Sequence, residues 1–324
     1  MKVVITGGGG FLGSQLSQKL LERGQLAGEP LEEIVLIDAF FRGPPQDARV
    51  RHACGDVGSK DFVFESVGSA RAITIFHLAS MVSGECEERF DDALRVNLDG
   101  SRHIFECARS LPGRPRVVFA SSIACFGGEG MMEVNSDGTK HTPQTTYGMT
   151  KAICEMLVND YTRKGFFDGR AIRLPTVIIR PGKPNAAASS WASGMFREPL
   201  NGEDCLLPVH RDQRHPMTGY RAVVESFIKM AEVPESVLGT DRAYVLPAHT
   251  VTPRLAESAI QEVSVVKGLK LGRIVDAPDA RIQRIVDNWP QAVDGTRSKR
   301  IGMPSPPPLR EMVEHYVDDF LQRT

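Results

Sequence analysis

The sequence lacks the features that mark several common classes of protein. It has no run of about 18 apolar residues, so no membrane-spanning helix is expected. Its net charge is −1, its pI is near 6.7, and no long block of Lys and Arg occurs, which argues against a nucleic-acid partner. The first residues lack the layout of a signal peptide. We therefore expect a cytoplasmic protein that binds neither membrane nor nucleic acid.

Cysteine and histidine are present but follow no ligand pattern. The six cysteines show no CxxC spacing, and the eight histidines form no HExxH motif or similar cluster. Neither a disulfide framework nor a metal site is expected from such spacing. With 324 residues, of which 41% are hydrophobic and 24% are charged, the chain is long enough to bury a substantial core.

A glycine-rich stretch near the start carries the first positive signal. The apolar segment KVVIT is followed by GGGGFLG and then by SQLSQKLLERG, whose leucines recur at helical spacing. This order predicts a strand, a glycine turn and a helix. In such a unit Gly7, Gly10 and Gly13 allow a tight turn, the approach of backbone N–H groups to a pyrophosphate, and close helix packing.

A second apolar segment, EEIVLIDAF, supplies Asp38 near its end. A carboxylate at this place can accept hydrogen bonds from the ribose hydroxyls of adenosine, and it repels a 2′-phosphate. The pattern therefore favours NAD over NADP. The alternative, that Asp38 only caps a turn, stays open.

Three further apolar segments follow, in RHACGDVGS, TIFHLAS and RVVFASS, and each is separated from the last by enough chain for a helix. This alternation predicts an α/β fold with a Rossmann-type doubly wound parallel sheet. Ligands of such sheets lie beyond the carboxyl ends of the strands. We therefore expect one rim to hold Gly10, Asp38, Asp56, Ala79 and Ser122.

Six motifs, TGGGGFLG, GDV, HLAS, FASSIACFG, YGMTK and RLPTVIIRPG, occur in this order. Over residues 1–182 the chain resembles the extended short-chain dehydrogenase/reductase family, the NAD-dependent epimerases and dehydratases. The resemblance implies an NAD-binding Rossmann domain over 1–175 and 216–240. It implies a smaller C-terminal substrate-binding lobe over 176–215 and 241–324.

The resemblance also implies NAD as cofactor and a catalytic set that matches Ser122, Tyr147 and Lys151. Ser122 is preferred to Ser121 because Phe126 gives it the family's register, with an aromatic residue four positions later. The residues that it assigns to the cofactor are Gly7, Gly10, Phe11, Leu12, Gly13, Asp38, Asp56, Val57, Leu78, Ala79, Tyr147 and Lys151. Asn97 matches a residue that supports the sheet, so it is left out of the catalytic set.

The catalytic pair has a physical rationale of its own. Tyr147 precedes Lys151 by four residues, so on a helix both lie on one face, one turn apart. A free tyrosine, with a pKa of about 10, is protonated at pH 7. We expect the Lys151 ammonium and the positive nicotinamide to lower that pKa, while Ser122 orients the substrate oxygen. The alternative is an exposed pair without a catalytic role.

The segment KPNAAASSWASGMFREPLNGE breaks the alternation, and we expect it to cross the cleft. Lys183 and Arg214 are candidate partners for an anion, and Thr176 and Asn185 for hydroxyl groups, although each could equally be a surface or structural residue. With Ser122 they form the predicted substrate set. Near the end, the apolar residues of 309–321 have helical spacing and predict a packed helix, with a homodimer contact as an alternative.

Within the family, the stretch RLPTVIIRPGKPNAAASS resembles that of D-erythronate dehydrogenases. This resemblance implies NAD-dependent oxidation of the C2 hydroxyl of a four-carbon sugar acid. A nucleotide-sugar epimerase or dehydratase with bound NAD is the first alternative, although Phe126 stands where that group usually has a tyrosine. A non-catalytic NAD-sensing regulator is the second, and the presence of Ser122, Tyr147 and Lys151 argues against it.

Overall fold

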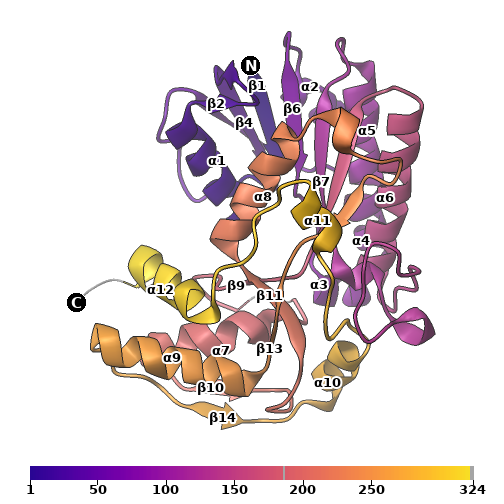
Figure 1. The fold of residues 1–324 in the computed structure, drawn as a ribbon. Helices are drawn as coiled ribbons and strands as arrows, with labels where there is room; N and C mark the ends of the chain where they lie inside the picture. The colour runs from indigo at the N-terminus through magenta and orange to yellow at the C-terminus, as the bar shows by residue number, and fades with distance from the viewer. Residues whose placement is uncertain (185–186, 322–324) are drawn as a thin grey trace.

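A seven-stranded sheet dominates the computed structural model, which describes residues 1–184 and 187–321 (Figure 1). All its strand pairs are parallel, in the order β12-β8-β7-β6-β1-β4-β5. The strands are β1 (Lys2–Thr6), β4 (Glu33–Asp38), β5 (Val50–Cys54), β6 (Ile73–His77), β7 (Arg116–Ser122), β8 (Asp168–Leu174) and β12 (Ala243–Val245). The predicted doubly wound parallel sheet is confirmed.

Helices cover both faces of this sheet, which explains why its inner strands are buried along nearly their whole length. One face packs on α1 (Phe11–Arg23) and α8 (Tyr220–Glu232). The other packs on α2 (Lys60–Val67), α5 (Gly100–Ser110) and α6 (Thr146–Arg163). Before α5 the chain forms α3 (Ser83–Glu88), α4 (Phe90–Ala93) and a π-helical turn, η1 (Leu94–Asp99).

The smaller part lies beyond the carboxyl ends of the large sheet's strands and has its own core (Figure 1). Its sheets join β9 (Thr176–Ile178), β11 (His215–Gly219) and β13 (His249–Val251), and β10 (Cys205–Leu207) with β14 (Ile274–Asp276). Its helices are α7 (Ser190–Leu200), α9 (Pro253–Lys267), α10 (Ala280–Asp287) and α12 (Leu309–Phe320). The helix predicted near the end is confirmed as α12, whose buried residues are Met312, Val313, Tyr316 and Val317.

Short elements complete the described chain. They are β2 (Gln25–Leu26), β3 (Glu29–Pro30), η2 (Ile123–Cys125), η3 (Gly128–Gly130), η4 (Glu235–Val237) and α11 (Thr296–Arg300). None of the helices in residues 1–184 and 187–321 combines the length and the apolarity needed to cross a membrane.

Two boundaries between the parts lie at other positions than the sequence indicates. Strand β11 pairs with β9 in the small sheet, although residues 216–240 were expected in the Rossmann domain. Strand β12 pairs with β8 in the large sheet, although residues 241–324 were expected in the lobe. Both strands are short, and their side chains give no sign of which sheet they join.

Candidate functional site

The loop between β1 and α1 can be built only with glycine. Gly7 has φ +72°, and a Cβ there would lie 2.9 Å from the amide nitrogen of Ala79. A Cβ on Gly13 would lie 2.2 Å from the carbonyl oxygen of Gly7. The first turn of α1 has neither a side-chain cap nor an acidic residue. Its backbone N–H groups and the positive end of its dipole therefore face the groove, which suits a pyrophosphate.

A groove with a volume of about 640 Å³ runs along this rim. Its lining includes all twelve residues that were assigned to the cofactor, from Gly7 and Asp38 to Tyr147 and Lys151. Asp38 is oriented by the amide of Gly9, which donates to its Oδ2 atom at 3.0 Å. Asp56 accepts from the amide of Gly58 at 2.7 Å and pairs with Arg95. The donor set and the glycine loop therefore fit a dinucleotide.

A buried hydrogen-bond network fixes the segment expected beside the nicotinamide. The amides of Leu78 and Ala79 donate to Thr6 Oγ1 at 3.2 and 3.1 Å. Thr6 Oγ1 also lies 2.6 Å from His77 Nδ1, and His77 Nε2 lies 2.9 Å from Ser101 Oγ. Burial lowers the pKa of His77 to about 3, so the ring is neutral. The sequence analysis missed this role of Thr6 and His77.

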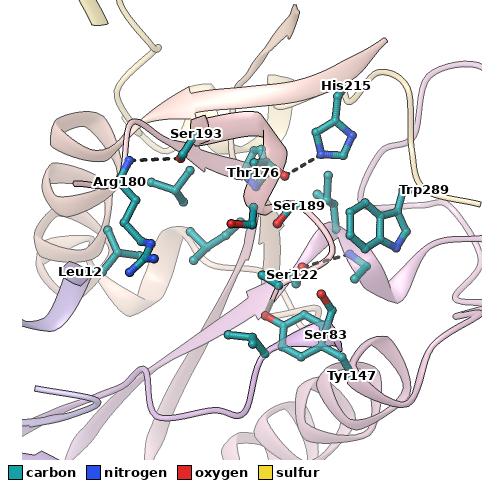
Figure 2. A pocket seen from close by; sticks show the side chains of 18 of the residues that line it. Leu12, Ser83, Ser122, Tyr147, Thr176, Arg180, Ser189, Ser193, His215 and Trp289 are labelled. Atoms are coloured by element: carbon teal, nitrogen blue, oxygen red, sulfur yellow. Dashed lines mark hydrogen bonds between the residues drawn. The ribbon is translucent and has the colours of Figure 1, made fainter. Parts of the chain in front are cut away.

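The three predicted catalytic residues lie at the carboxyl end of β7 and the start of α6. A Cβ on Gly148 would lie 2.0 Å from the carbonyl oxygen of Ala124, so α6 packs directly against the chain that follows β7. This close packing brings Tyr147 beside Ser122, as Figure 2 shows. The neighbouring Ser121 is buried, and its hydroxyl donates to Glu155. The geometry therefore favours Ser122 over Ser121.

The pKa of Tyr147 shifts in the direction opposite to the one expected. Burial raises the pKa of Tyr147 to about 12, and a hydrogen bond with Ser122 opposes that rise. Lys151 donates from Nζ to the carbonyl oxygen of Ala120 at 2.8 Å, and Nζ lies 5.4 Å from the centre of the Tyr147 ring. Burial lowers the pKa of Lys151 to about 8. Protein groups alone therefore keep Tyr147 protonated, because burial outweighs the hydrogen bond with Ser122.

A second, smaller cavity of about 280 Å³ adjoins the groove (Figure 2). Leu12, Val82, Tyr147, Leu174 and Arg180 line both spaces, so the two are continuous. Ser122 and Tyr147 lie at one end of the view, Thr176 and His215 at the opposite end, and Arg180 to one side. The cavity volume is near the lower limit of about 300 Å³ for small-molecule sites, which fits a compact substrate.

The predicted substrate residues are only partly brought together. Ser122 and Thr176 line the smaller cavity. Lys183 and Arg214 are both exposed, and neither lines this cavity or the groove. Asn185 lies outside the described residues. An anion contact for Lys183 or Arg214 stays a prediction, and another cation lies closer to both spaces.

That cation is Arg180, which follows β9 and which the sequence analysis missed. Its amide donates to Ser193 Oγ at 3.1 Å, and its guanidinium donates to the carbonyl oxygen of Lys183. Within the described part of the chain it forms no ion pair with a carboxylate. Burial and the neighbouring cations Arg197 and Arg42 lower its pKa. A partly buried guanidinium without a counter-charge is a strong binding partner for an anion.

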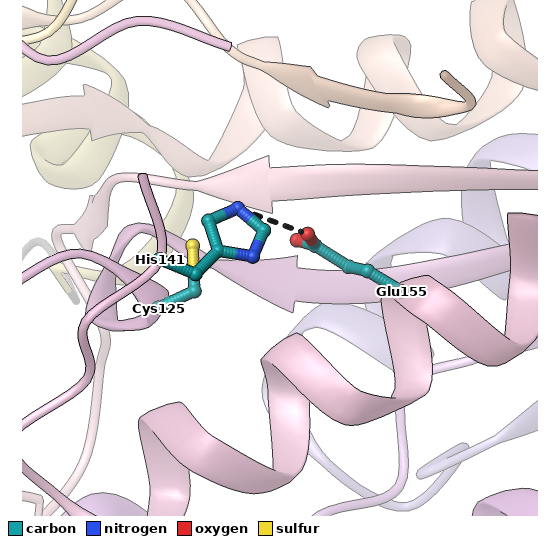
Figure 3. Close-up of side chains that lie close together, drawn as sticks. All are labelled: Cys125, His141 and Glu155. Carbon is teal, nitrogen blue, oxygen red and sulfur yellow. Dashed lines mark ion pairs between the residues drawn. The ribbon is translucent and has the colours of Figure 1, made fainter. Parts of the chain in front are cut away.

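One group of possible metal ligands lies beside α6, the helix that carries Tyr147 and Lys151. Ligand atoms of Cys125, His141 and Glu155 lie within 4.8 Å of one another (Figure 3). However, both carboxylate oxygens of Glu155 already accept hydrogen bonds from buried Arg173, at 2.9–3.1 Å, and Ser121 donates to one of them. A guanidinium at this distance repels a metal cation. The cluster is better described as a buried ion pair that holds α6 against β8.

Comparisons with known proteins identify the family of the chain. Residues 3–245 match the model of the NAD dependent epimerase/dehydratase family. The chain is 40% identical to a D-erythronate dehydrogenase from Cupriavidus necator, over 98% of each chain. It is 37% identical to one from Haemophilus influenzae, over 98% of this chain and 99% of the other.

A solved structure is similar over nearly the whole chain. It is described as a nucleoside-diphosphate-sugar epimerase from Agrobacterium tumefaciens. It is 36% identical, has a TM-score of 0.86, and the match covers 99% of this chain and 94% of that one. The predictions of family, fold and cofactor are confirmed: the chain belongs to the NAD-dependent epimerase/dehydratase family, and its cofactor is NAD.

Proposed function

We propose that the protein is a dehydrogenase that oxidises the C2 hydroxyl of D-erythronate, with 2-dehydro-D-erythronate and NADH as products. Two relatives that match over nearly their whole length carry the name D-erythronate dehydrogenase. The one structural observation that carries the proposal is the position of Arg180. It places a cation that has no carboxylate partner among the described residues at the cavity that also holds Ser122 and Tyr147, which is where a hydroxy acid needs a partner for its carboxylate.

In the proposed reaction Tyr147 accepts the proton of the substrate hydroxyl, and Ser122 holds the substrate oxygen through its own hydroxyl. NAD, held by the glycine loop and Asp38 along the groove, would supply the hydride acceptor for the carbon that bears this hydroxyl, and its positive nicotinamide ring would favour the phenolate. Lys151 holds its Nζ group between Ala120 and the Tyr147 ring, where it lines the cofactor groove. The C–H and O–H bonds break, a C=O bond forms, and the proton remains on Tyr147 until solvent takes it.

The nucleotide-sugar alternative receives less support. The similar Agrobacterium structure carries the name of a nucleoside-diphosphate-sugar epimerase. However, a cavity of about 280 Å³ suits a four-carbon acid better than a nucleotide sugar. Phe126 is fully buried and offers no hydroxyl near the substrate.

The test compares an acid with a neutral polyol. We expect purified protein with NAD to produce NADH from D-erythronate and little from erythritol. The reason is that Arg180 has no carboxylate to bind when the neutral polyol occupies the cavity. Arg180→Leu should raise the KM for D-erythronate about 10- to 100-fold, the scale of a lost charged hydrogen bond, and should narrow the preference for acid over polyol.

Lys183 and Arg214, two exposed cations that do not line the cavity, provide matched controls. Lys183→Ala and Arg214→Ala should leave the acid-to-polyol ratio unchanged. Because Arg180 also lines the groove, the ratio is more informative than NAD affinity. Equal oxidation of both compounds, or activity with nucleotide sugars only, would contradict the proposal.

We propose that the protein acts in the cytoplasm on a small sugar acid. A homodimer stays a prediction, which sedimentation equilibrium of the purified protein would check.

A further inference from the structure

The end of the smaller cavity that lies opposite Tyr147 contains a hydrogen-bonded pair, of which one member is buried and the other is partly buried. Thr176 on β9 and His215 on β11 line the cavity, and Thr176 Oγ1 lies 2.6 Å from His215 Nε2 (Figure 2). His215 is only 1% exposed, yet its Nδ1 atom has no hydrogen-bond partner in the described protein. A buried polar atom without a partner costs free energy, so its presence at a cavity indicates a ligand group.

The chemistry of the pair limits what that group can be. If Nδ1 carries the proton, Nε2 accepts from Thr176, and the pair offers a free N–H donor and a free lone pair on the threonine oxygen. If Nε2 carries the proton, the pair offers a free threonine O–H donor and a free lone pair on Nδ1. In either tautomer the pair presents one donor and one acceptor. An alcohol matches this pattern, whereas a carboxylate needs donors only.

The surroundings of His215 also fit a neutral, hydroxylated ligand. The ring lies between Trp191 and Trp289, with centroid distances of 5.7 Å to each. Burial lowers the pKa of His215 to about 4, so it carries no charge near pH 7. Trp289 lines the cavity, and its indole N–H is a second buried donor without a partner among the described residues. The apolar ring faces suit the C–H groups of a short carbon chain.

We propose that Thr176 and His215, with Trp289 beside them, form a subsite for the hydroxyl groups that the substrate carries beyond its reacting carbon. The subsite determines specificity: it selects sugar acids over 2-hydroxy acids that have a plain alkyl chain. This inference rests on the proposed function, and it adds a residue set that the sequence analysis did not name apart from Thr176.

The test compares two four-carbon acids that differ only in these hydroxyl groups. D-erythronate has hydroxyls on C3 and C4, and 2-hydroxybutanoate of the same C2 configuration has neither. For wild-type protein with NAD we expect kcat/KM to favour D-erythronate at least about 100-fold, because a site built for hydroxyl groups rejects an analogue that leaves its polar atoms unpaired.

Thr176→Val and His215→Phe keep the size and remove the polar atoms. Each should reduce this preference at least about 10-fold by lowering kcat/KM for D-erythronate and not for 2-hydroxybutanoate. Thr176→Ser retains the hydroxyl and should retain the preference. Arg214→Ala, an exposed neighbour of His215, is the control. A purely structural role would lower both kcat/KM values together and leave their ratio unchanged, and that result would overturn the inference.

Failure of the proposed function has a different signature. It would appear as absence of NADH formation from D-erythronate by the wild-type protein. Calorimetric binding of the two acids to the NADH-loaded protein then tests the subsite without turnover. Tighter binding of D-erythronate that Thr176→Val abolishes would support the subsite, and binding of neither acid would refute both proposals.

Discussion

Replacing Lys151 with methionine should stabilise the protein while it impairs activity. The Lys151 side chain is only 4% exposed, and burial lowers its pKa from an ordinary 10.5 to about 8. At 1.36 kcal/mol per pKa unit, holding the charged ammonium in the folded protein costs about 3 kcal/mol at neutral pH. Methionine removes that cost but also removes the hydrogen bond to Ala120, worth about 1 kcal/mol. The expected net gain is about 2 kcal/mol.

The gain should depend on pH in a defined direction. The folded-state pKa of Lys151 lies below its unfolded value, so between pH 8 and 10.5 the unfolded chain binds more protons than the folded one. Stability of the wild-type protein from this group therefore rises with pH across that window. The difference in free energy of unfolding between Lys151→Met and wild type should be largest at pH 7 and should shrink towards pH 10.5.

Urea unfolding without added nucleotide, monitored at pH 7, 9 and 10, would measure this difference. Lys164→Met, at an exposed position just after α6, is the control and should change stability by less than about 0.5 kcal/mol. A Lys151→Met protein that is less stable than wild type at pH 7, or a difference that does not vary with pH, would refute the reasoning. Turnover should fall in any case, because Lys151 lines the cofactor groove.

Two further predictions concern the reacting proton and the ribose. Tyr147→Phe should lower kcat at least about 100-fold, the lower scale for a positioned acid or base, while NAD binding by fluorescence stays nearly unchanged; near-normal turnover would remove Tyr147 from the mechanism. Asp38→Asn keeps the acceptor for the Gly9 amide but loses the charge that repels a 2′-phosphate, so the ratio of kcat/KM for NAD over NADP should fall. A wild-type preference for NADP would contradict the role of Asp38.

The residues that line the cofactor groove could be predicted from the sequence because they lie at the ends of strands or directly after them. Gly7, Asp38, Ala79 and Ser122 each come after an apolar segment, and parallel strands deliver such residues to a single rim. Helical spacing predicted that Tyr147 and Lys151 share one face of a helix, and α6 confirms that placement. Spacing could not predict the direction of the Lys151 side chain, which is set by its hydrogen bond to the buried carbonyl oxygen of Ala120 at the end of β7.

Apart from Arg180, the residues of the smaller cavity could not be predicted in this way, because they come from separate short elements. Arg180 lies within the motif RLPTVIIRPG, directly after an apolar strand, so the strand-end rule that found Asp38 would also have found it. Lys183 and Arg214 were predicted as anion partners in its place. His215 and Trp289 are separated by 74 positions and belong to no common period, and only packing around the ring of His215 brings them together. No local pattern marks such a contact.

The repeated passage of the chain between the two parts governs the order in which the protein can be completed. The large sheet lacks its edge strand until β12, at residues 243–245, has been synthesised. By that time four elements of the smaller part have already been made, namely β9, α7, β10 and β11. Trp289 and α12 follow later still. Each part is built from separate segments of the sequence, so the smaller part cannot be exchanged between relatives as one continuous segment. A new substrate preference must instead be acquired by substitutions in place, within a cofactor-binding frame that is already built.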